Sequence, residues 1–157
     1  GMVKVNEEFF KWLSGDKTMP FGDNNRHVPI KLIDFDNLSN NTYIATNQFR
    51  IHHRETKIPD IVLFINGIPV VVGEAKTPIR PSISWLDGAS EINEVYENTV
   101  PQLFVPNILS FATEGKFLYY GSPCEKTESK LNRKRYRRPV ESCNFVGYSA
   151  ELFFVYH

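Results

Sequence analysis

The sequence predicts an α/β fold in which a mixed central β-sheet is flanked by helices. Two apolar, β-branched runs enclose Asn66-Gly67 and predict a β-hairpin at the centre of the chain. Apolar residues at helical spacing follow this hairpin, and a second pair of alternating runs follows the helix. At 157 residues the chain is long enough for one domain with a proper core.

The elements before the hairpin are expected to be one helix and two strands. Asn6 can cap a helix that ends at Gly15, and the Pro, Gly and Asn residues within 16–27 predict a loop. Strands are expected over residues 28–35 and 42–53. With the hairpin and the later elements, the expected order is a helix, four strands, a helix and two strands.

The register of the central hairpin decides whether its charged residues meet. A two-residue loop would oppose Asp60 to Gly73 and send Glu74 to the other face of the sheet. A three-residue loop over residues 66–68, with a bulge, would oppose Asp60 to Glu74. We expect this bulged register, which also places Lys76 on the same face as Glu74.

This arrangement suits metal-assisted phosphodiester hydrolysis. Opposed residues have Cβ atoms roughly 5 Å apart, so two carboxylates could share one divalent cation. Mg²⁺ or Mn²⁺ accepts such oxygen ligands, and a nearby lysine can orient the nucleophile or stabilise charge growing on the phosphate. The alternative interpretation is an ordinary hairpin that ends in a surface ion pair, because an aspartate followed by Glu-x-Lys is a loose pattern.

Several short segments, in a fixed order over roughly residues 28 to 122, form a wider pattern around the hairpin. They are Leu32-Ile33-Asp34-Phe35-Asp36-Asn37, Asn47-Gln48-Phe49, Pro59-Asp60 and the run after it, Gly73-Glu74-Ala75-Lys76, Pro101-Gln102-Leu103-Phe104, Asn107 and Tyr120-Gly121-Ser122. This pattern resembles the PD-(D/E)xK nuclease superfamily, and specifically the N-terminal nuclease domain of the R subunit of type I restriction-modification enzymes. The resemblance implies a restriction-endonuclease-like core over residues 2–122 and a C-terminal extension over residues 123–157.

The resemblance assigns roles to four residues. Asp60 and Glu74 would be metal ligands and Lys76 the catalytic lysine, with the Ala75 carbonyl as a further ligand. An acidic residue from an upstream helix is also common in the superfamily. Glu7 and Glu8 are the early candidates, although acids at a helix start also stabilise the helix itself.

The helix after the hairpin raises a second question. The family often carries a Gln-x-x-x-Tyr motif there, and Tyr96 fits it, but Ile92 stands at the glutamine position. Steps of four, three and four also predict one apolar face that packs on the sheet, so core packing is an equal alternative for the tyrosine. The residues of this face are Trp85, Ala89, Ile92 and Tyr96.

Charge and composition restrict where DNA could bind. The chain has 18 basic and 18 acidic side chains, so any affinity for nucleic acid must come from local patches. Candidates are Arg54 and Lys57, and a basic run within residues 126–138 that includes Tyr136; solvated loop or tail charges are the alternative. His52 and His53 are adjacent, so on a strand they face opposite ways and cannot bind one ion together.

The remaining aspartate and cysteine candidates favour ordinary structural roles over metal binding. Asp34 and Asp36 lie in a segment rich in Asn and Ser, where a capping or turn role is more typical than metal binding. Cys124 and Cys143 lack the spacing of a zinc site and are typical of free thiols in a reducing cytosol. No membrane-length apolar run occurs, so a cytoplasmic protein is expected.

The family also implies partners. R subunits carry an ATP-driven motor after the nuclease, and they act with modification and specificity subunits on DNA. This chain has no GxxxxGK[ST] loop, so ATP would act only through motor domains absent from it, and we expect a fragment or a truncated relative. The opposing hypothesis is a catalytically silent module with the same fold that binds DNA or docks to other subunits.

Overall fold

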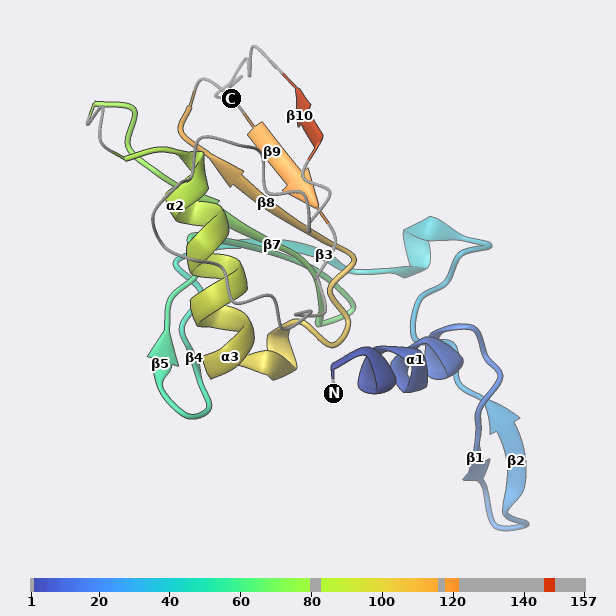
Figure 1. Ribbon diagram of the computed structural model, residues 1–157. Coiled ribbons are helices and arrows are strands. Elements are labelled where there is room, and N and C mark those ends of the chain that lie inside the picture. Colours follow the sequence, from blue (N-terminus) through green and yellow to red (C-terminus); the bar gives the residue numbers. More distant parts are fainter. Residues whose placement is uncertain (1, 80–82, 116–117, 122–145, 149–157) are drawn as a thin grey trace.

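The computed structural model describes residues 2–79, 83–115, 118–121 and 146–148 (Figure 1). The basic run within residues 126–138, both cysteines and the domain boundary near residue 122 lie outside the described residues, so the predictions made for them stay predictions. No helix among the described residues is long and apolar enough to cross a membrane.

A six-stranded sheet forms the centre of the fold, and its strand order is β10-β9-β8-β7-β6-β3. Strands β7 and β8 run parallel, whereas every other neighbouring pair is antiparallel, so the predicted mixed sheet is confirmed. The six strands are β3 (Tyr43–Asn47), β6 (Ile61–Ile65), β7 (Ile68–Ala75), β8 (Leu109–Thr113), β9 (Leu118–Gly121) and β10 (Val146–Tyr148).

A continuous helical segment connects β7 to β8 and packs against the sheet (Figure 1). It consists of α2 (Trp85–Ser90), a π-helical stretch η2 (Glu91–Tyr96) and α3 (Glu97–Thr99), and a 3₁₀ turn η3 (Pro101–Leu103) follows. A connection of this kind is what a parallel strand pair requires. The core lies beneath it and contains Val62, Val72, Ile92, Tyr96, Val100, Leu103 and Phe104.

The N-terminal region differs from the prediction. Helix α1 (Met2–Leu13) begins before Asn6, so this residue does not cap it; its amide contacts the Phe104 carbonyl oxygen instead. Residues 16–27 are not a plain loop, because β1 (Thr18–Phe21) and β2 (Arg26–Pro29) form a hairpin that extends away from the main sheet (Figure 1). The strand expected over residues 28–35 was therefore wrong beyond Pro29.

The strand expected over residues 42–53 is interrupted. Strand β3 ends at Asn47 because Gln48 has a left-handed backbone with φ of 51°. The chain then forms a small separate hairpin from β4 (Ile51–His52) and β5 (Thr56–Lys57). Between the two, the Phe49 ring packs edge-on against Phe64 at a centroid distance of 5.1 Å.

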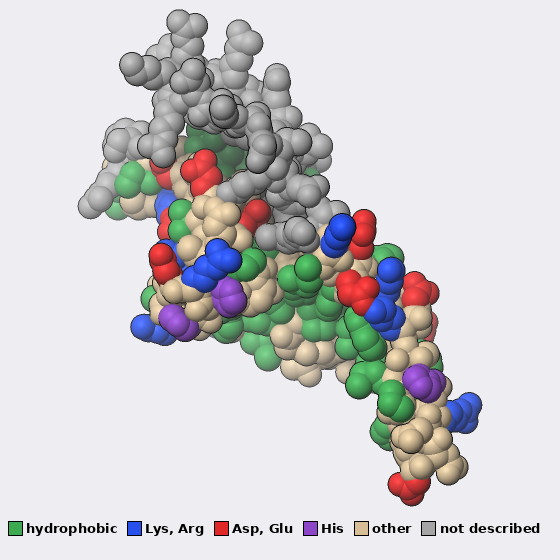
Figure 2. All heavy atoms as spheres, turned by 60° about the horizontal axis from the view of Figure 1, so that its bottom comes forward, with side chains coloured by type: hydrophobic (Ala, Val, Ile, Leu, Met, Phe, Trp, Pro, Cys, Tyr) green, Lys and Arg blue, Asp and Glu red, His purple; other side chains and the backbone are tan. Residues whose placement is uncertain are grey.

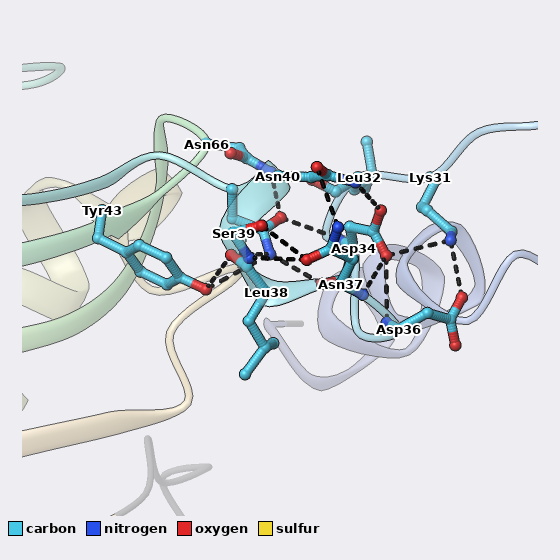
Figure 3. A network of polar contacts seen from close by, with 11 residues as sticks. Lys31, Leu32, Asp34, Asp36, Asn37, Leu38, Ser39, Asn40, Tyr43 and Asn66 are labelled. Atoms are coloured by element: carbon cyan, nitrogen blue, oxygen red, sulfur yellow. Dashed lines mark hydrogen bonds and ion pairs between the residues drawn. The ribbon is translucent and has the colours of Figure 1, made fainter.

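A polar network orders the segment before β3 (Figure 3). The Asp34 carboxylate accepts hydrogen bonds from the backbone N–H groups of Asp36 and Asn37, so its predicted turn role is confirmed. A hydrogen bond from the Asn40 amide, together with those from Asn37 and Lys31, holds the pKa of Asp34 well below its ordinary value. The 3₁₀ turn η1 (Leu38–Asn40) follows and leads into β3.

The turn residue Asn66 ties this segment to the central hairpin. Its side-chain oxygen accepts a hydrogen bond from Thr42 N–H at 2.8 Å. Its side-chain nitrogen donates to the Leu32 carbonyl oxygen and to Asn41 Oδ1, both at 2.9 Å. Asn66 therefore fixes the 32–42 segment as well as the turn.

We expect Asn66→Gly to lower the free energy of unfolding by about 2 kcal/mol, since it loses hydrogen bonds worth about 1 kcal/mol each while glycine tolerates the left-handed φ of 51°. Urea unfolding followed by circular dichroism measures this. Asn25→Gly is the matched control, because Asn25 has φ of 49° but no side-chain hydrogen bond among the described residues. Equal effects at both positions would contradict the role of the amide.

Candidate active site

The central hairpin opposes the two predicted carboxylate positions, but not by the predicted loop. Asn66 and Gly67 have φ of 51° and 79° and form a two-residue turn, with Ile65 paired to Ile68. The register then shifts, because Phe64 pairs with Pro69 whereas Leu63 pairs with Val71.

The extra residue is Val70, whose side chain is buried. The three-residue loop was therefore wrong, and a β-bulge within β7 takes its place. Beyond the bulge Ile61 pairs with Gly73, so Asp60, directly before β6, is next in line with Glu74 of β7.

The structure brings Asp60, Glu74 and Lys76 together. Lys76 Nζ donates to Glu74 Oε1 at 2.9 Å, and Asp60 is close enough for its charge to raise the pKa of Glu74. Asp60 Oδ2 accepts a hydrogen bond from the Ala75 backbone N–H at 2.9 Å, while Oδ1 accepts one from Gln48 Nε2 at 2.5 Å. The role of the Ala75 carbonyl as a metal ligand stays a prediction.

Glu91 and Tyr96 complete the cluster. Lys76 Nζ donates to Glu91 Oε2 at 2.5 Å as well as to Glu74. The Tyr96 hydroxyl lies 3.2 Å from Glu74 Oε2 and 3.1 Å from Glu91 Oε1. Glu74, Lys76, Glu91 and Tyr96 thus form a closed ring in which each carboxylate contacts both the lysine and the tyrosine.

The sequence did not predict Glu91 as a site residue. The expected motif compares Tyr96 with the residue four positions earlier, and that residue, Ile92, is fully buried in the core. Residues five apart lie on nearly opposite sides of an α-helix. The π-helical stretch η2 has wider turns, which bring Glu91 to the same side as Tyr96.

A glycine lets the helical segment approach the cluster closely. A Cβ atom added at Gly88 would lie 3.3 Å from Ala112 Cβ and 3.4 Å from Glu74 Cβ and Cγ. Helix α2 is fixed at its start by a capping box between Ser84 and Asp87. The helical segment is therefore positioned to place Glu91 and Tyr96 beside the end of β7.

Burial controls the electrostatics of the cluster. Glu74 is only 4% exposed, and this burial, together with the charges of Asp60 and Glu91, raises its pKa to about 7 despite the opposing effect of Lys76. Burial tends to lower the pKa of Lys76, but its hydrogen bonds to Glu91 and Glu74 outweigh it, so the pKa is raised. Burial and the two glutamates also raise the pKa of Tyr96 far above its ordinary value, so the phenol stays protonated.

The other candidates have different surroundings. Glu7 and Glu8 are exposed on α1, and Glu8 forms ion pairs with Lys11 and Lys17. Among the described residues, no contact joins either glutamate to Asp60, Glu74 or Lys76. An additional upstream acidic ligand stays a prediction.

Arg54, beside the hairpin β4–β5, is exposed, whereas Lys57 is half-buried. Figure 2 shows histidine and basic side chains next to one another on one face of the molecule. Lys57 forms an ion pair with Glu55 at 2.8 Å, and His52 Nδ1 lies 3.0 Å from Thr56 Oγ1. His53 and Arg54 are exposed, which leaves contact with a DNA backbone sterically open.

Comparison with known proteins identifies the family. The family model described as type I restriction enzyme R protein N terminus matches residues 2–129. The HindI endonuclease subunit of a type I restriction enzyme from Haemophilus influenzae is 33% identical over 125 residues, which cover 77% of this chain and 12% of that protein. A Methanocaldococcus jannaschii protein that carries the name MjaIXP endonuclease subunit is 30% identical over 121 residues, covering 73% of this chain and 11% of its own length.

The chain spans about a tenth of the length of these curated relatives. The family match nevertheless covers most of the chain and includes every residue of the carboxylate and lysine cluster. The α/β fold is consistent with the family resemblance inferred from the short matching sequence segments. The chain therefore belongs to the family of type I restriction enzyme R protein N-terminal regions.

Proposed function

We propose that this chain is a metal-dependent DNA endonuclease domain of a type I restriction enzyme R subunit and hydrolyses DNA phosphodiester bonds. The observation that supports this most directly is the placement of Asp60 and Glu74 next to each other, one position beyond the Ile61–Gly73 pair, with Lys76 hydrogen-bonded to Glu74 at 2.9 Å. The relatives named as endonuclease subunits of type I restriction enzymes give the proposal its substrate class.

The donor set fits a hard divalent cation. Asp60 and Glu74 offer carboxylate oxygens from adjacent strands, and burial of Glu74 beside two other carboxylates disfavours its charge unless a cation compensates it. Asp60 and Glu74 would hold Mg²⁺ or Mn²⁺, with the Ala75 carbonyl as a further ligand. When bound, the ion would supply Lewis-acid stabilisation of charge on the scissile phosphate.

The remaining residues of the cluster control the lysine. Lys76 is held between Glu74 and Glu91, so its ammonium is fixed in position and stays charged because its pKa is raised. From there it can donate a hydrogen bond to a phosphate oxygen as negative charge grows in the transition state. The Tyr96 hydroxyl lies within hydrogen-bonding distance of both glutamates, and because its phenol stays protonated it can donate its single proton to one of them at a time.

The proposal extends to partners. DNA is the substrate, and modification and specificity subunits of a restriction complex would select where the domain cuts. ATP would act only through motor domains outside this chain. The opposing hypothesis, a silent binding or docking module, does not account for the buried Glu74 and its contact with the half-buried Lys76, because such burial costs desolvation of charge.

The test is titration calorimetry of MgCl₂ and MnCl₂ into the wild type and Asp60→Ala, with plasmid nicking on the same samples. We expect the wild type to bind and nick, and Asp60→Ala to lose both, because half of the carboxylate pair is gone. Asp23→Ala, which removes an exposed carboxylate in the β1–β2 turn, is the matched control.

Two outcomes separate the hypotheses. Metal binding without nicking in the wild type would mean that the site needs the motor or partner subunits for cleavage. A wild type that binds no metal at millimolar concentration would contradict the proposed function and favour the silent module.

A further inference from the structure

Gln48 holds an unusual position next to the proposed metal site. It directly follows β3, and its φ of 51° lies in the left-handed region that favours glycine and asparagine. Apart from glycines, the described residues with positive φ are Gln48, Asn25 and Asn66, so the other two are asparagines. Glutamine has no such local preference, so the conformation of Gln48 must be imposed by its surroundings.

Those surroundings are the residues around Asp60. Gln48 N–H donates to the Asp60 carbonyl oxygen at 2.9 Å, and Phe49 N–H donates to the Pro59 carbonyl oxygen at 3.0 Å. In a regular antiparallel pair, successive N–H groups point to opposite sides. The left-handed residue lets two successive N–H groups bond the same neighbouring segment, so the backbones of residues 48–49 and 59–60 are joined.

The residues on both sides of this junction pack into the protein interior. Phe49 packs on Phe64 and against the core cluster, and Pro59 is fully buried. The side chain of Gln48 itself is exposed, so burial of its own surface does not explain why the strained backbone is kept. Besides the two backbone hydrogen bonds, the conformation provides a side-chain hydrogen bond from Gln48 Nε2 to Asp60 Oδ1 at 2.5 Å.

This bond completes the fixation of the Asp60 carboxylate. The Ala75 N–H holds Oδ2 at 2.9 Å from strand β7, and Gln48 holds Oδ1 from the end of β3. Each oxygen of the carboxylate therefore accepts one hydrogen bond, and the two donors come from different segments. Each carboxylate oxygen has two lone pairs, so one on each oxygen stays available for a cation.

We propose that Gln48 is a positioning residue that orients the Asp60 carboxylate for binding a divalent cation. The inference rests on the proposed function, because it concerns the same metal site. A ligating carboxylate depends on its own hydrogen-bond partners, and loss of such a partner typically weakens metal binding by about 10- to 100-fold.

Two substitutions separate positioning from fold stability. Gln48→Met keeps the side-chain length and the left-handed backbone but removes the donor. Gln48→Met should therefore lower the free energy of unfolding. Gln48→Gly also removes the donor, but it relaxes the left-handed backbone and should raise the free energy of unfolding. Asn25→Gly is the matched control, because it relaxes a left-handed residue in the remote β1–β2 turn.

The measurement is titration calorimetry of MnCl₂ into each metal-free protein, with thermal unfolding recorded on the same samples. We expect both Gln48 variants to bind Mn²⁺ about 10- to 100-fold more weakly, whatever the sign of their stability change, and Asn25→Gly to bind as the wild type does. A purely structural role would alter unfolding and leave the affinity unchanged.

The possible failures are distinct. If the wild type binds Mn²⁺ and both Gln48 variants bind it equally well, the positioning role is overturned while the proposed function stands. If the wild type binds no Mn²⁺, the proposed function fails, and the role of Gln48 falls with it.

Discussion

DNA cleavage by Lys76→Ala is expected to fall about a thousandfold below the wild-type rate, while the protein stays folded and still binds metal. The lysine is the one cation that the described structure places among Glu74 and Glu91, and its side chain is 19% exposed. Removing it would take away the proposed hydrogen-bond donor for charge that grows on the phosphate in the transition state. The two proposed metal ligands remain.

The measurement is the initial rate of plasmid nicking in MgCl₂, with calorimetric titration of the same ion on each protein. Lys11→Ala, on the exposed surface of α1, is the control for loss of a positive charge and should nick at the wild-type rate. Equal nicking by Lys76→Ala and the wild type would point to another active site or to a contaminating nuclease. Loss of metal binding in Lys76→Ala would contradict the separation of roles between lysine and carboxylates.

The position of Lys76 could be predicted from the sequence because strong local signals determine it. Asn-Gly between β-branched runs is the strongest short-range signal for a hairpin, and alternation then places Glu74 and Lys76 on one face. The register that brings Asp60 beside Glu74 was predicted correctly, but it was attributed to a three-residue loop instead of a bulge in β7. A bulge at Val70 inside an apolar run has no composition signal, because the extra residue is as apolar as its neighbours.

The parts that sequence reasoning missed depend on tertiary contacts. Gln48 breaks the strand expected over residues 42–53, and nothing in a glutamine predicts a left-handed backbone. Glu91 reaches the site only through a π-helical turn, whereas the spacing argument assumed an α-helix. The β1–β2 hairpin was missed because β1 has only four residues and contains Pro20, with Gly22 directly after it, and such residues favour a loop.

The metal-free protein is expected to lose stability as the pH rises from about 4.5 to about 7. Glu74 has a pKa of about 7 in the folded protein, raised from 4.5 by burial and by Asp60 and Glu91. Below pH 4.5 the carboxyl is protonated in both the folded and the unfolded chain. Between the two pKa values the unfolded chain releases the proton while the folded protein keeps it, so the free energy of unfolding falls.

The expected loss from this group is about 3 kcal/mol, fully developed above pH 7, because each pKa unit corresponds to about 1.4 kcal/mol. The groups that face Glu74 are Asp60, Lys76, Glu91 and Tyr96; Lys76 opposes the shift, and the others raise the pKa or stay neutral. Glu74→Gln carries no titrating proton at this position. Its stability should therefore lack this pH dependence.

Urea unfolding of the wild type and Glu74→Gln at pH 5 and pH 8, in a chelating buffer, measures the difference directly. We expect the wild type to lose about 2.5 kcal/mol more than the variant between these pH values, because a small part of the loss has already occurred at pH 5. Adding MgCl₂ at pH 8 should restore stability to the wild type and not to Glu74→Gln, because only the wild type offers both carboxylates to the ion. Parallel pH profiles for the two proteins would show that Glu74 ionises normally, and the electrostatic reason for a cation at this site would be lost.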